Sequence, residues 1–220
     1  MDATAGWLTL KLALVTTVIL AAIGIPLAYW LATTSARWRP LVDALVALPL
    51  LLPPTVLGFY LLVGMGPSSP LGRAYAAVAD STLPFSFTGI VIASVVYNLP
   101  FAVRPFASGF AAVDRRLIDA GRCLGASPMR TFASIAIPLA WPGLLAGAVL
   151  AFAHTVGEFG VVLMVGGNIP GVTRTIALAI YDDVQALNYD AAGEASFILV
   201  LLAFSVLTLL HWAQRRVVPI

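Results

Sequence analysis

Residues 114–138 read DRRLIDAGRCLGASPMRTFASIAIP, the most informative stretch of a chain that is otherwise mostly apolar. Asp114 can cap a helix, because a short acidic side chain accepts a hydrogen bond from a free N–H group of the first turn. Gly125 suits the left-handed conformation that ends a helix, and Ser127 followed by Pro128 can cap and start the next one. The apolar positions of the first helix share one face at helical spacing: Leu117, Ala120, Gly121 and Leu124. The stretch therefore predicts a short amphipathic helix, a sharp turn, and a second helix that enters an apolar environment.

The composition of the whole chain indicates that its solvent is lipid. Of 220 residues, 60% are hydrophobic and 10% charged, and the mean hydropathy is +0.98. We expect an all-α integral membrane protein, because a helix crosses a bilayer with roughly 20 apolar residues and several stretches reach that length. The first stretch is full length and follows a start that is not basic, so we interpret it as a retained span rather than a signal peptide. A single transmembrane domain over residues 1–220 is expected, with five spans at about 8–32, 42–64, 86–108, 133–157 and 194–214.

The basic residues predict the orientation of these spans, since Lys and Arg near span ends stay on the cytoplasmic side. An N-terminus outside and a C-terminus inside place nine of the twelve basic residues in cytoplasmic loops, including the pair Arg215 and Arg216. Residues of about 109–131 then form a cytoplasmic loop. The net charge of +2 comes from these loops and does not indicate nucleic-acid binding. The lone Cys123 lies in the same loop and is interpreted as a small packing residue.

Three other segments depart from regular spans. Pro49, Pro53 and Pro54 interrupt the second span, which we expect to be bent or broken. Residues 64–84 are rich in Gly, Pro and Ser and predict an outer loop with a short helix around 73–79. Residues 174–187 predict a short outer-leaflet or re-entrant helix; whether they cross the membrane stays open, although a sixth crossing would move the basic C-terminal pair outside.

The spacing of the basic loop resembles the cytoplasmic signature of ABC importer permeases. That signature reads Glu-Ala-Ala, three residues, Gly, nine residues, Ile, any residue, Leu, Pro, and Asp119 and Gly121 replace its Glu and second Ala. The resemblance implies a type I ABC importer permease fold in which small residues of the first helix fit a cleft on an ATPase subunit. The alternative is an interfacial amphipathic helix without a partner. The ATPase-coupling residues implied are Asp119, Ala120, Gly121, Gly125, Ile135 and Pro138.

Further stretches resemble the molybdate permeases, which are close to the sulfate permeases. They are residues 48–58 (LPLLLPPTVLG), 98–100 (NLP) with Arg104, 157–160 (GEFG), 168–171 (NIPG) and 173–175 (TRT). The GEFG element is similar to both groups, whereas NIPG, the double proline and the short chain are more similar to molybdate permeases. Tungstate, sulfate and thiosulfate stay open as alternative substrates.

The resemblance implies the partners and the location of the chain. A homodimer would form the pore in a bacterial inner membrane, with two cytoplasmic ABC ATPase subunits and an extracytoplasmic molybdate-binding protein. The chain carries no P-loop motif, so ATP and Mg²⁺ would be used by the separate ATPase, and this chain would be neither an enzyme nor a cofactor protein.

Eight residues of these motifs are candidates for the gate or the substrate pathway: Pro53, Pro54, Thr55, Asn98, Gly157, Glu158, Phe159 and Gly160. Spans two and four contain no Lys or Arg, so we expect no tight anion site in the permease. The candidate hydrogen-bond donors are Thr55, Ser94, Tyr97 and Asn98, although hydroxyl groups often bond to their own helix.

His154 and Glu158 are four residues apart and would share a helix face near the outer end of the fourth span. An ionisable residue in a span is a functional candidate. We favour a gate or a subunit contact for Glu158 over a solvated carboxylate. A proton relay or metal site is the third possibility, but two ligands are too few for zinc and the expected depth is interfacial.

Two other classes of membrane protein fit the sequence less well. An intramembrane enzyme would need a nucleophile and base or a ligand set, yet the chain has two histidines and no Gly-x-Ser-x-Gly elbow. A secondary transporter would usually carry intramembrane charges or an internal repeat, and the sequence has neither.

Overall fold

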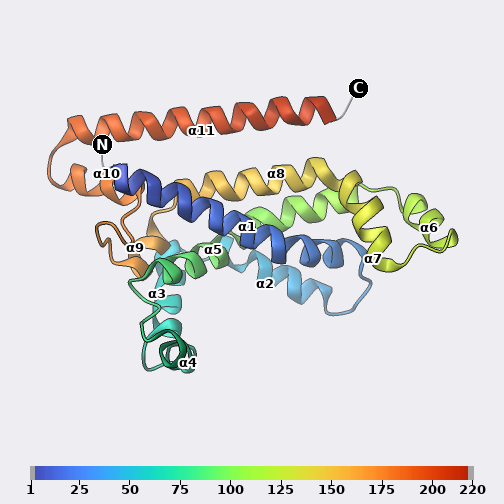
Figure 1. Ribbon diagram of the computed structural model, residues 1–220, viewed down its shortest axis with the longest axis horizontal. Coiled ribbons are helices and arrows are strands. Elements are labelled where there is room, and N and C mark those ends of the chain that lie inside the picture. The colour runs from blue at the N-terminus through green and yellow to red at the C-terminus, as the bar shows by residue number, and fades with distance from the viewer. Residues whose placement is uncertain (1–2, 218–220) are drawn as a thin grey trace.

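The computed structural model describes the backbone of residues 3–217 and the side chains of residues 3–208, and this part of the chain is helical with no β-strand. Three long helices form an elongated core (Figure 1): α1 (Ala3–Thr33), α5 (Phe87–Ala111) and α8 (Ile137–Val156). Glycines let two of them touch, since a Cβ built on Gly143 of α8 would lie 2.5 Å from the Cα of Gly109 in α5. Phe106 of α5 is buried at the centre of this core.

The second apolar segment is broken, as its prolines predict. It consists of α2 (Arg39–Leu51) and α3 (Pro54–Met65), whose axes differ by 111°. Leu52 and Pro53 each precede a proline and adopt extended ψ angles of 136° and 137°, because the following ring disfavours the helical conformation. Beyond α3 the chain forms the short helix α4 (Pro70–Ala79), which stands away from the core in Figure 1 and matches the helix expected in this loop.

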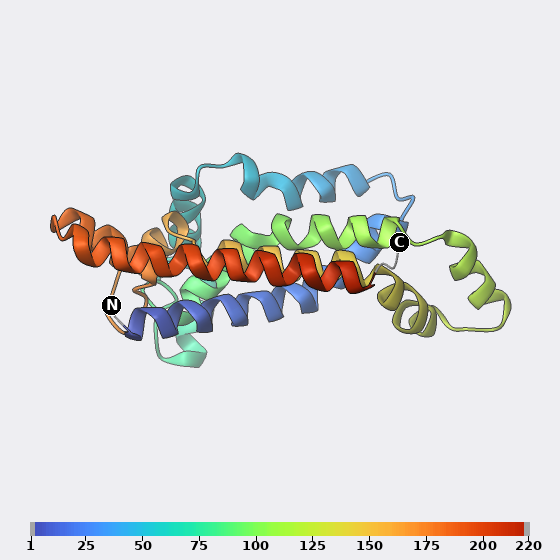
Figure 2. The ribbon, with the colours of Figure 1, turned by 90° about the horizontal axis from the view of Figure 1, so that it is seen from above.

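Four helices are long and apolar enough to cross a bilayer, and the bent pair of α2 and α3 is a fifth candidate. The last of the four is the described part of α11 (Tyr189–Val217), which runs along the bundle and is largely exposed (Figure 2). The helix expected within 174–187 is α10 (Ile176–Gln185). At 1.5 Å per residue it is about 15 Å long, half the thickness of the hydrocarbon layer, so this helix alone cannot span it.

The fourth expected span is not one regular helix. The helical segment that contains it begins with α7 (Pro128–Thr131), before the expected start at about residue 133, continues through the π-helix η1 (Phe132–Ala136) and ends as α8. Pro138 lacks the N–H group that would bond to Ser134, and the wider π turn lies directly before it. After α8, the short helix α9 (Gly160–Gly166) continues the chain in a different direction.

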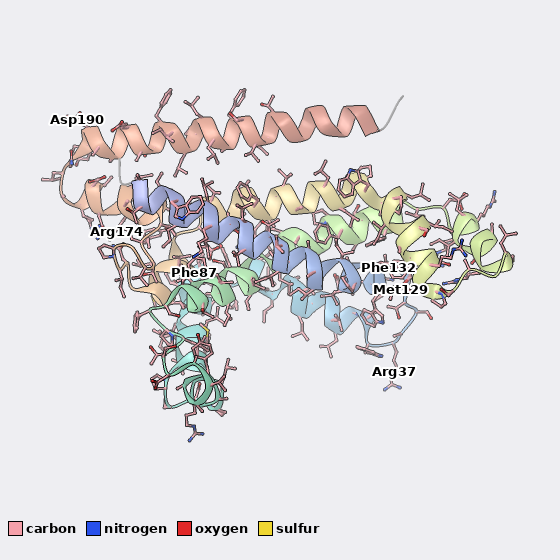
Figure 3. The ribbon with its side chains drawn as sticks, in the orientation of Figure 1. Arg37, Phe87, Met129, Phe132, Arg174 and Asp190 are labelled. Atoms are coloured by element: carbon pink, nitrogen blue, oxygen red, sulfur yellow. The ribbon has the colours of Figure 1, made fainter. Side chains whose placement is uncertain are left out.

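The two ends of the bundle differ in character. Figure 3 places Arg37, Met129 and Phe132 toward one end, and Arg174 and Asp190 toward the other. At the first end α6 (Arg115–Cys123) projects beyond the other helices (Figure 2). Arg215 and Arg216, on which the expected orientation partly depends, have side chains outside the described residues.

Candidate functional site

Where α3, α5 and α8 meet the start of α9, the structure contains an open cavity of about 540 Å³. Six of the eight residues expected at a gate or pathway line it, namely Pro54, Thr55, Gly157, Glu158, Phe159 and Gly160. The remaining lining residues are Tyr97, Ala153 and His154. Asn98 lies directly behind Glu158, and Pro53 is the residue before α3, outside the lining. Motifs that are about a hundred residues apart in the sequence therefore meet at one place.

Close packing of α3 on α9 forms one wall of this cavity. A Cβ on Gly160 would lie 2.8 Å from the Cβ of Pro54, and one on Gly58 would lie 2.7 Å from the Cβ of Met164. Neither position has room for a larger side chain without moving a helix. Gly58 and Gly160, which belong to two different sequence motifs, are therefore both needed for the close contact between α3 and α9. The sequence did not reveal this shared role.

Asn98 is the centre of a cluster of polar side chains behind the cavity lining, formed with Glu158 and His154. Its Nδ2 donates to Glu158 Oε2 at 2.8 Å and to the carbonyl oxygen of Ser94 at 2.9 Å. Both amide hydrogens are then used, so Oδ1 faces His154 Nδ1 at 2.8 Å and must accept. This network assigns the proton of the imidazole to Nδ1. The ring of His154 also stacks on Phe101, with centroids 3.8 Å apart.

The cluster is buried, and one atom of its carboxyl group is left over. Asn98 is 0% exposed and Glu158 is 4% exposed. Glu158 Oε1 and Ser94 Oγ have no hydrogen-bond partner among the residues that the structure describes. Leaving a buried polar atom unpaired costs free energy, and neither of these two atoms is accessible from the cavity.

Glu158 follows directly after α8, at the end of the fourth span as expected, but it does not lie at the end of the bundle. The sequence placed it near the outer end of a span, whereas its carboxyl contacts Asn98, which lies midway along α5. The reason is that α8 ends at Val156, near the middle of α5, and α9 and the following loop complete the bundle beyond that point. Ser94 and Asn98 are fully buried and outside the lining, so of the four expected donors only Thr55 and Tyr97 line the cavity.

The projecting helix α6 is built as the sequence predicts. Asp114 Oδ1 accepts from the N–H of Arg116 at 2.9 Å, and Ser127 Oγ accepts from that of Arg130 at 3.3 Å. Gly125 has a φ of 83°, and the N–H of Ala126 donates to the carbonyl of Gly121 at 3.0 Å. These contacts form a Schellman motif, which fixes the sharp turn after the helix.

One expectation about α6 needs correction. Gly121 is buried and faces the protein, because the space where its Cβ would stand is filled by Ile135 of η1. The sequence suggested that Gly121 would face a partner, and for this residue the expectation is wrong. Asp119, Ala120 and Leu124 are exposed, as is the neighbouring Leu117. Ile135 is thereby brought against α6, while Pro138 lies in the first turn of α8.

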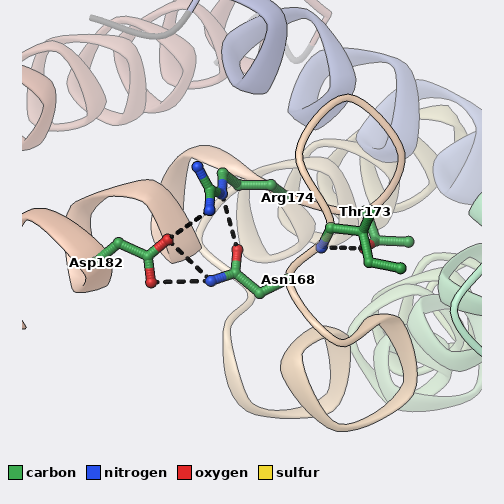
Figure 4. A network of polar contacts seen from close by, with 5 residues as sticks. Asn168, Thr173, Arg174 and Asp182 are labelled. Carbon is green, nitrogen blue, oxygen red and sulfur yellow. Dashed lines mark hydrogen bonds and ion pairs between the residues drawn. The ribbon is translucent and has the colours of Figure 1, made fainter.

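A second polar network ties the loop between α9 and α10 together at the opposite end (Figure 4). Asn168 Nδ2 donates to both carboxyl oxygens of Asp182 at 2.9 Å, and Arg174 Nε donates to Asn168 Oδ1 at 3.1 Å. Arg174 also forms an ion pair with Asp182 at 3.1 Å. Thr173 Oγ1 accepts from the N–H of Ile169 and donates to the carbonyl of Gly166. The NIPG and TRT motifs thus bind each other within one loop, which the sequence did not indicate.

No three His, Cys, Asp or Glu side chains gather at metal-binding distance in the described part of the chain.

Comparison with protein families matches residues 24–219 to the family described as binding-protein-dependent transport system inner membrane component. The chain is 51% identical over 208 residues to the molybdenum transport system permease protein ModB of Azotobacter vinelandii, covering 94% of this chain and 92% of that protein. It is 36% identical over 210 residues to the ModB protein of Escherichia coli K12, covering 94% and 91%.

Solved structures share the fold at much lower identity. An inward-facing structure of the MetNI methionine ABC transporter matches with a TM-score of 0.76 and 20% identity, covering 97% of this chain and 94% of the matched chain. A bacterial ABC transporter that imports alginate matches with a TM-score of 0.79 and 17% identity, covering 98% and 79%. At these identities the likeness concerns the fold alone.

Proposed function

Because this chain belongs to the family of binding-protein-dependent transport system inner membrane components, we propose that it is the permease subunit of an ATP-driven molybdate importer. The observation that carries the proposal is the similarity to molybdenum permeases over 94% of the chain. The part of the chain that matches the family, residues 24–219, includes both the cavity and the projecting helix α6. The permease provides the membrane pathway for the oxyanion and passes on the motion of a separate ATPase.

The ATPase contact is assigned to α6, which supports the coupling role of Asp119, Ala120, Gly121, Gly125, Ile135 and Pro138. Leu117 is 49% exposed and Leu124 is 89% exposed, and together with Ala120 they form an apolar face that no other described helix covers. Gly121 and Ile135 act from behind this face, since they join α6 to η1 and thus to the long helix α8. A force applied to α6 would reach the cavity along α8, because His154 is in the last turn of that helix.

The topology that fits this role has five spans, with the bent pair α2 and α3 counted as one broken span and α10 not crossing. The chain lies in the inner membrane of a bacterial cell. Its N-terminus is outside the cytoplasm and its C-terminus is in the cytoplasm. This orientation puts α6 on the cytoplasmic side, where an ATPase can reach it. The type I importer fold is the arrangement proposed for these helices.

The pore is assigned to a homodimer of this chain, with the 540 Å³ cavity facing it. Pro53 and Pro54 position the start of α3 at the cavity, and Gly157, Glu158, Phe159 and Gly160 form the facing wall. These residues, with Asn98 behind them, are proposed to act as gate and pathway. Two ABC ATPase subunits and an extracytoplasmic molybdate-binding protein complete the importer, and ATP and Mg²⁺ are used by the ATPase.

The test is uptake of labelled molybdate by proteoliposomes that contain this chain, a candidate ATPase subunit and a candidate binding protein. Uptake should require ATP and all three proteins, and excess tungstate should compete because it is also a tetrahedral dianion. Competition by sulfate or thiosulfate would instead assign the chain to a sulfate-type importer. Uptake without the ATPase would make it a secondary transporter and would refute the proposal.

A further inference from the structure

Arg104 is a charged residue in the interior of a membrane-spanning helix. α5 is continuous from Phe87 to Ala111, and Arg104 lies about 10 Å before its end at 1.5 Å per residue. The helix is about 37 Å long and the hydrocarbon layer about 30 Å thick, so a centred α5 holds the backbone of Arg104 about 7 Å inside that layer. The sequence predicts that this span ends at about residue 108, and the longer helix puts Arg104 deeper than expected.

The guanidinium group of Arg104 has neither a hydrogen bond nor an ion pair with any residue that the structure describes. The helices that pack against α5 are α1, α2, α3, α8 and α9. Within their described residues the only acidic side chain is Asp43 of α2, and it forms no ion pair with Arg104. An unpaired charge inside a bilayer is costly, and such residues face a water-filled space and mark the path of an ion.

Arg104 belongs to a narrow strip of α5 that the neighbouring helices leave uncovered. It is the only exposed residue of α5 between Thr88 and Ser108. The strip consists of Tyr97, Phe101, Arg104 and Ser108, which lie within about 60° of one another because successive residues of a helix are about 100° apart. The rest of the helix surface is covered by the core of the bundle.

One end of this strip forms part of the cavity. Tyr97 lines the cavity, and Phe101 stacks on His154, another lining residue, with ring centroids 3.8 Å apart. From Tyr97 the strip runs toward the end of the bundle that carries α6, because α6 follows the end of α5. Arg104 therefore lies two helical turns, about 10 Å, from Tyr97 on the side of α6.

We propose that the strip continues the substrate pathway and that Arg104 is its oxyanion-binding residue on the cytoplasmic side of the cavity. The inference rests on the proposed function and assigns the cationic contact of the same substrate. The planar guanidinium group offers paired N–H donors that match two oxygens of a tetrahedral oxyanion. In a homodimer each copy contributes one Arg104 at the same depth, so two positive charges meet a dianion.

The position of Arg104 beyond the cavity gives the pathway a direction. The cavity lining contains no Lys or Arg, so an anion there has no cationic partner. Positive charges nearer the cytoplasm attract it inward, as rings of basic side chains do in anion pores. Because Arg104 is exposed, water screens its charge, and the contact is weak enough to release the oxyanion.

Two substitutions separate the charge of Arg104 from its shape. Arg104→Gln removes the charge, whereas Arg104→Lys keeps the charge and loses the paired donors. In the importer reconstituted with its ATPase and binding protein, we expect ATP-dependent molybdate uptake to fall at least about tenfold in the first variant and about threefold in the second. Arg37→Gln is the matched control, because Arg37 is exposed at the end of the bundle in the loop between α1 and α2, and its uptake should equal that of the wild type.

Other results of these assays would overturn the inference. Wild-type uptake by Arg104→Gln would show that Arg104 only extends to the membrane surface. Uptake restored by combining Arg104→Asp with Asp43→Arg would show that the two residues form a structural ion pair between copies. If the wild type itself imports no molybdate, the proposed function fails instead.

Accessibility to a charged, water-soluble thiol reagent tests the strip independently of transport. A Cys123→Ser background removes the only cysteine of the chain. In this background Arg104→Cys should react with a methanethiosulfonate reagent added from the cytoplasmic side. Val18→Cys is the control and should not react, because Val18 is 66% exposed at the middle of α1, where lipid excludes the reagent. Reaction at position 104 no faster than at position 18 would show that the strip faces lipid and would contradict the inference.

Discussion

Gly121 of α6 and Ile135 of η1 are in direct contact, since a Cβ built on Gly121 would lie 2.5 Å from the Cδ1 of Ile135. Two residues of the permease signature thus contact each other inside the protein. The exposed residues of the same signature remain accessible to a partner. The atom that fills the space is the flexible end of a side chain, so the contact can adjust to a small substitution and not to a large one.

Gly121→Ala should be tolerated, because Ile135 can rotate away and alanine favours the helix by about 1 kcal/mol relative to glycine. Gly121→Leu should force α6 away from η1. In the reconstituted importer we expect this second variant to hydrolyse ATP with little molybdate uptake. Normal uptake by Gly121→Leu would show that the contact does not transmit motion.

Asp114→Ala should loosen α6, since its side chain caps the first turn. Loss of such a cap costs about 1 kcal/mol, which corresponds to about fivefold faster amide exchange in this helix. Asp114→Asn is the matched control, because asparagine caps equally well. Hydrogen exchange of the α6 amides measures the difference, and equal rates in the two variants would rule out the cap as the cause.

Gly160→Ala should separate α3 from α9, because the new Cβ would meet the Cβ of Pro54, which cannot rotate away. We expect a loss of about 1–3 kcal/mol of stability and reduced uptake. Gly64→Ala in α3, the helix against which Gly160 packs, is the control, since a Cβ there has nothing within 4 Å. Thermal unfolding in detergent should distinguish the two, and equal melting temperatures would show that the helices can move apart freely.

Asn168 combines a left-handed backbone, with a φ of 57°, and side-chain bonds to Asp182 and Arg174. Asn168→Gly loses the bonds but accepts this backbone conformation, whereas Asn168→Ala loses the bonds and is also strained. The alanine variant should be less stable than the glycine variant by about 1 kcal/mol. Thermal unfolding of both variants checks this, and a more stable alanine variant would mean that the loop has changed conformation.

Local features of the basic loop could be predicted from the sequence. The caps at Asp114 and Ser127 and the left-handed Gly125 each depend on neighbours within five residues, and the structure contains all three. The break after Leu52 was predictable for the same reason, because a proline restricts the residue before it.

The direction in which Gly121 faces could not be predicted, because it depends on Ile135, which reaches it only after the chain has turned at Gly125. The depth of Glu158 was missed for a similar reason. Hydropathy measures the length of an apolar run, but the run around α8 includes a π-helix at one end and stops midway along α5 at the other.

The sequence by itself determined that the chain is a helical membrane protein and which short motifs end its helices, because composition, apolar run length and local hydrogen bonding act over a few turns of chain. The sequence also singled out every residue of the cavity lining except Ala153 as a candidate. Only the tertiary structure decided that Pro54 and Glu158 line one cavity, that Asn98 uses both amide hydrogens, and that Oε1 of Glu158 is buried without a hydrogen bond. Such contacts depend on how whole helices pack, and packing is set by side-chain shapes across segments far apart in the sequence.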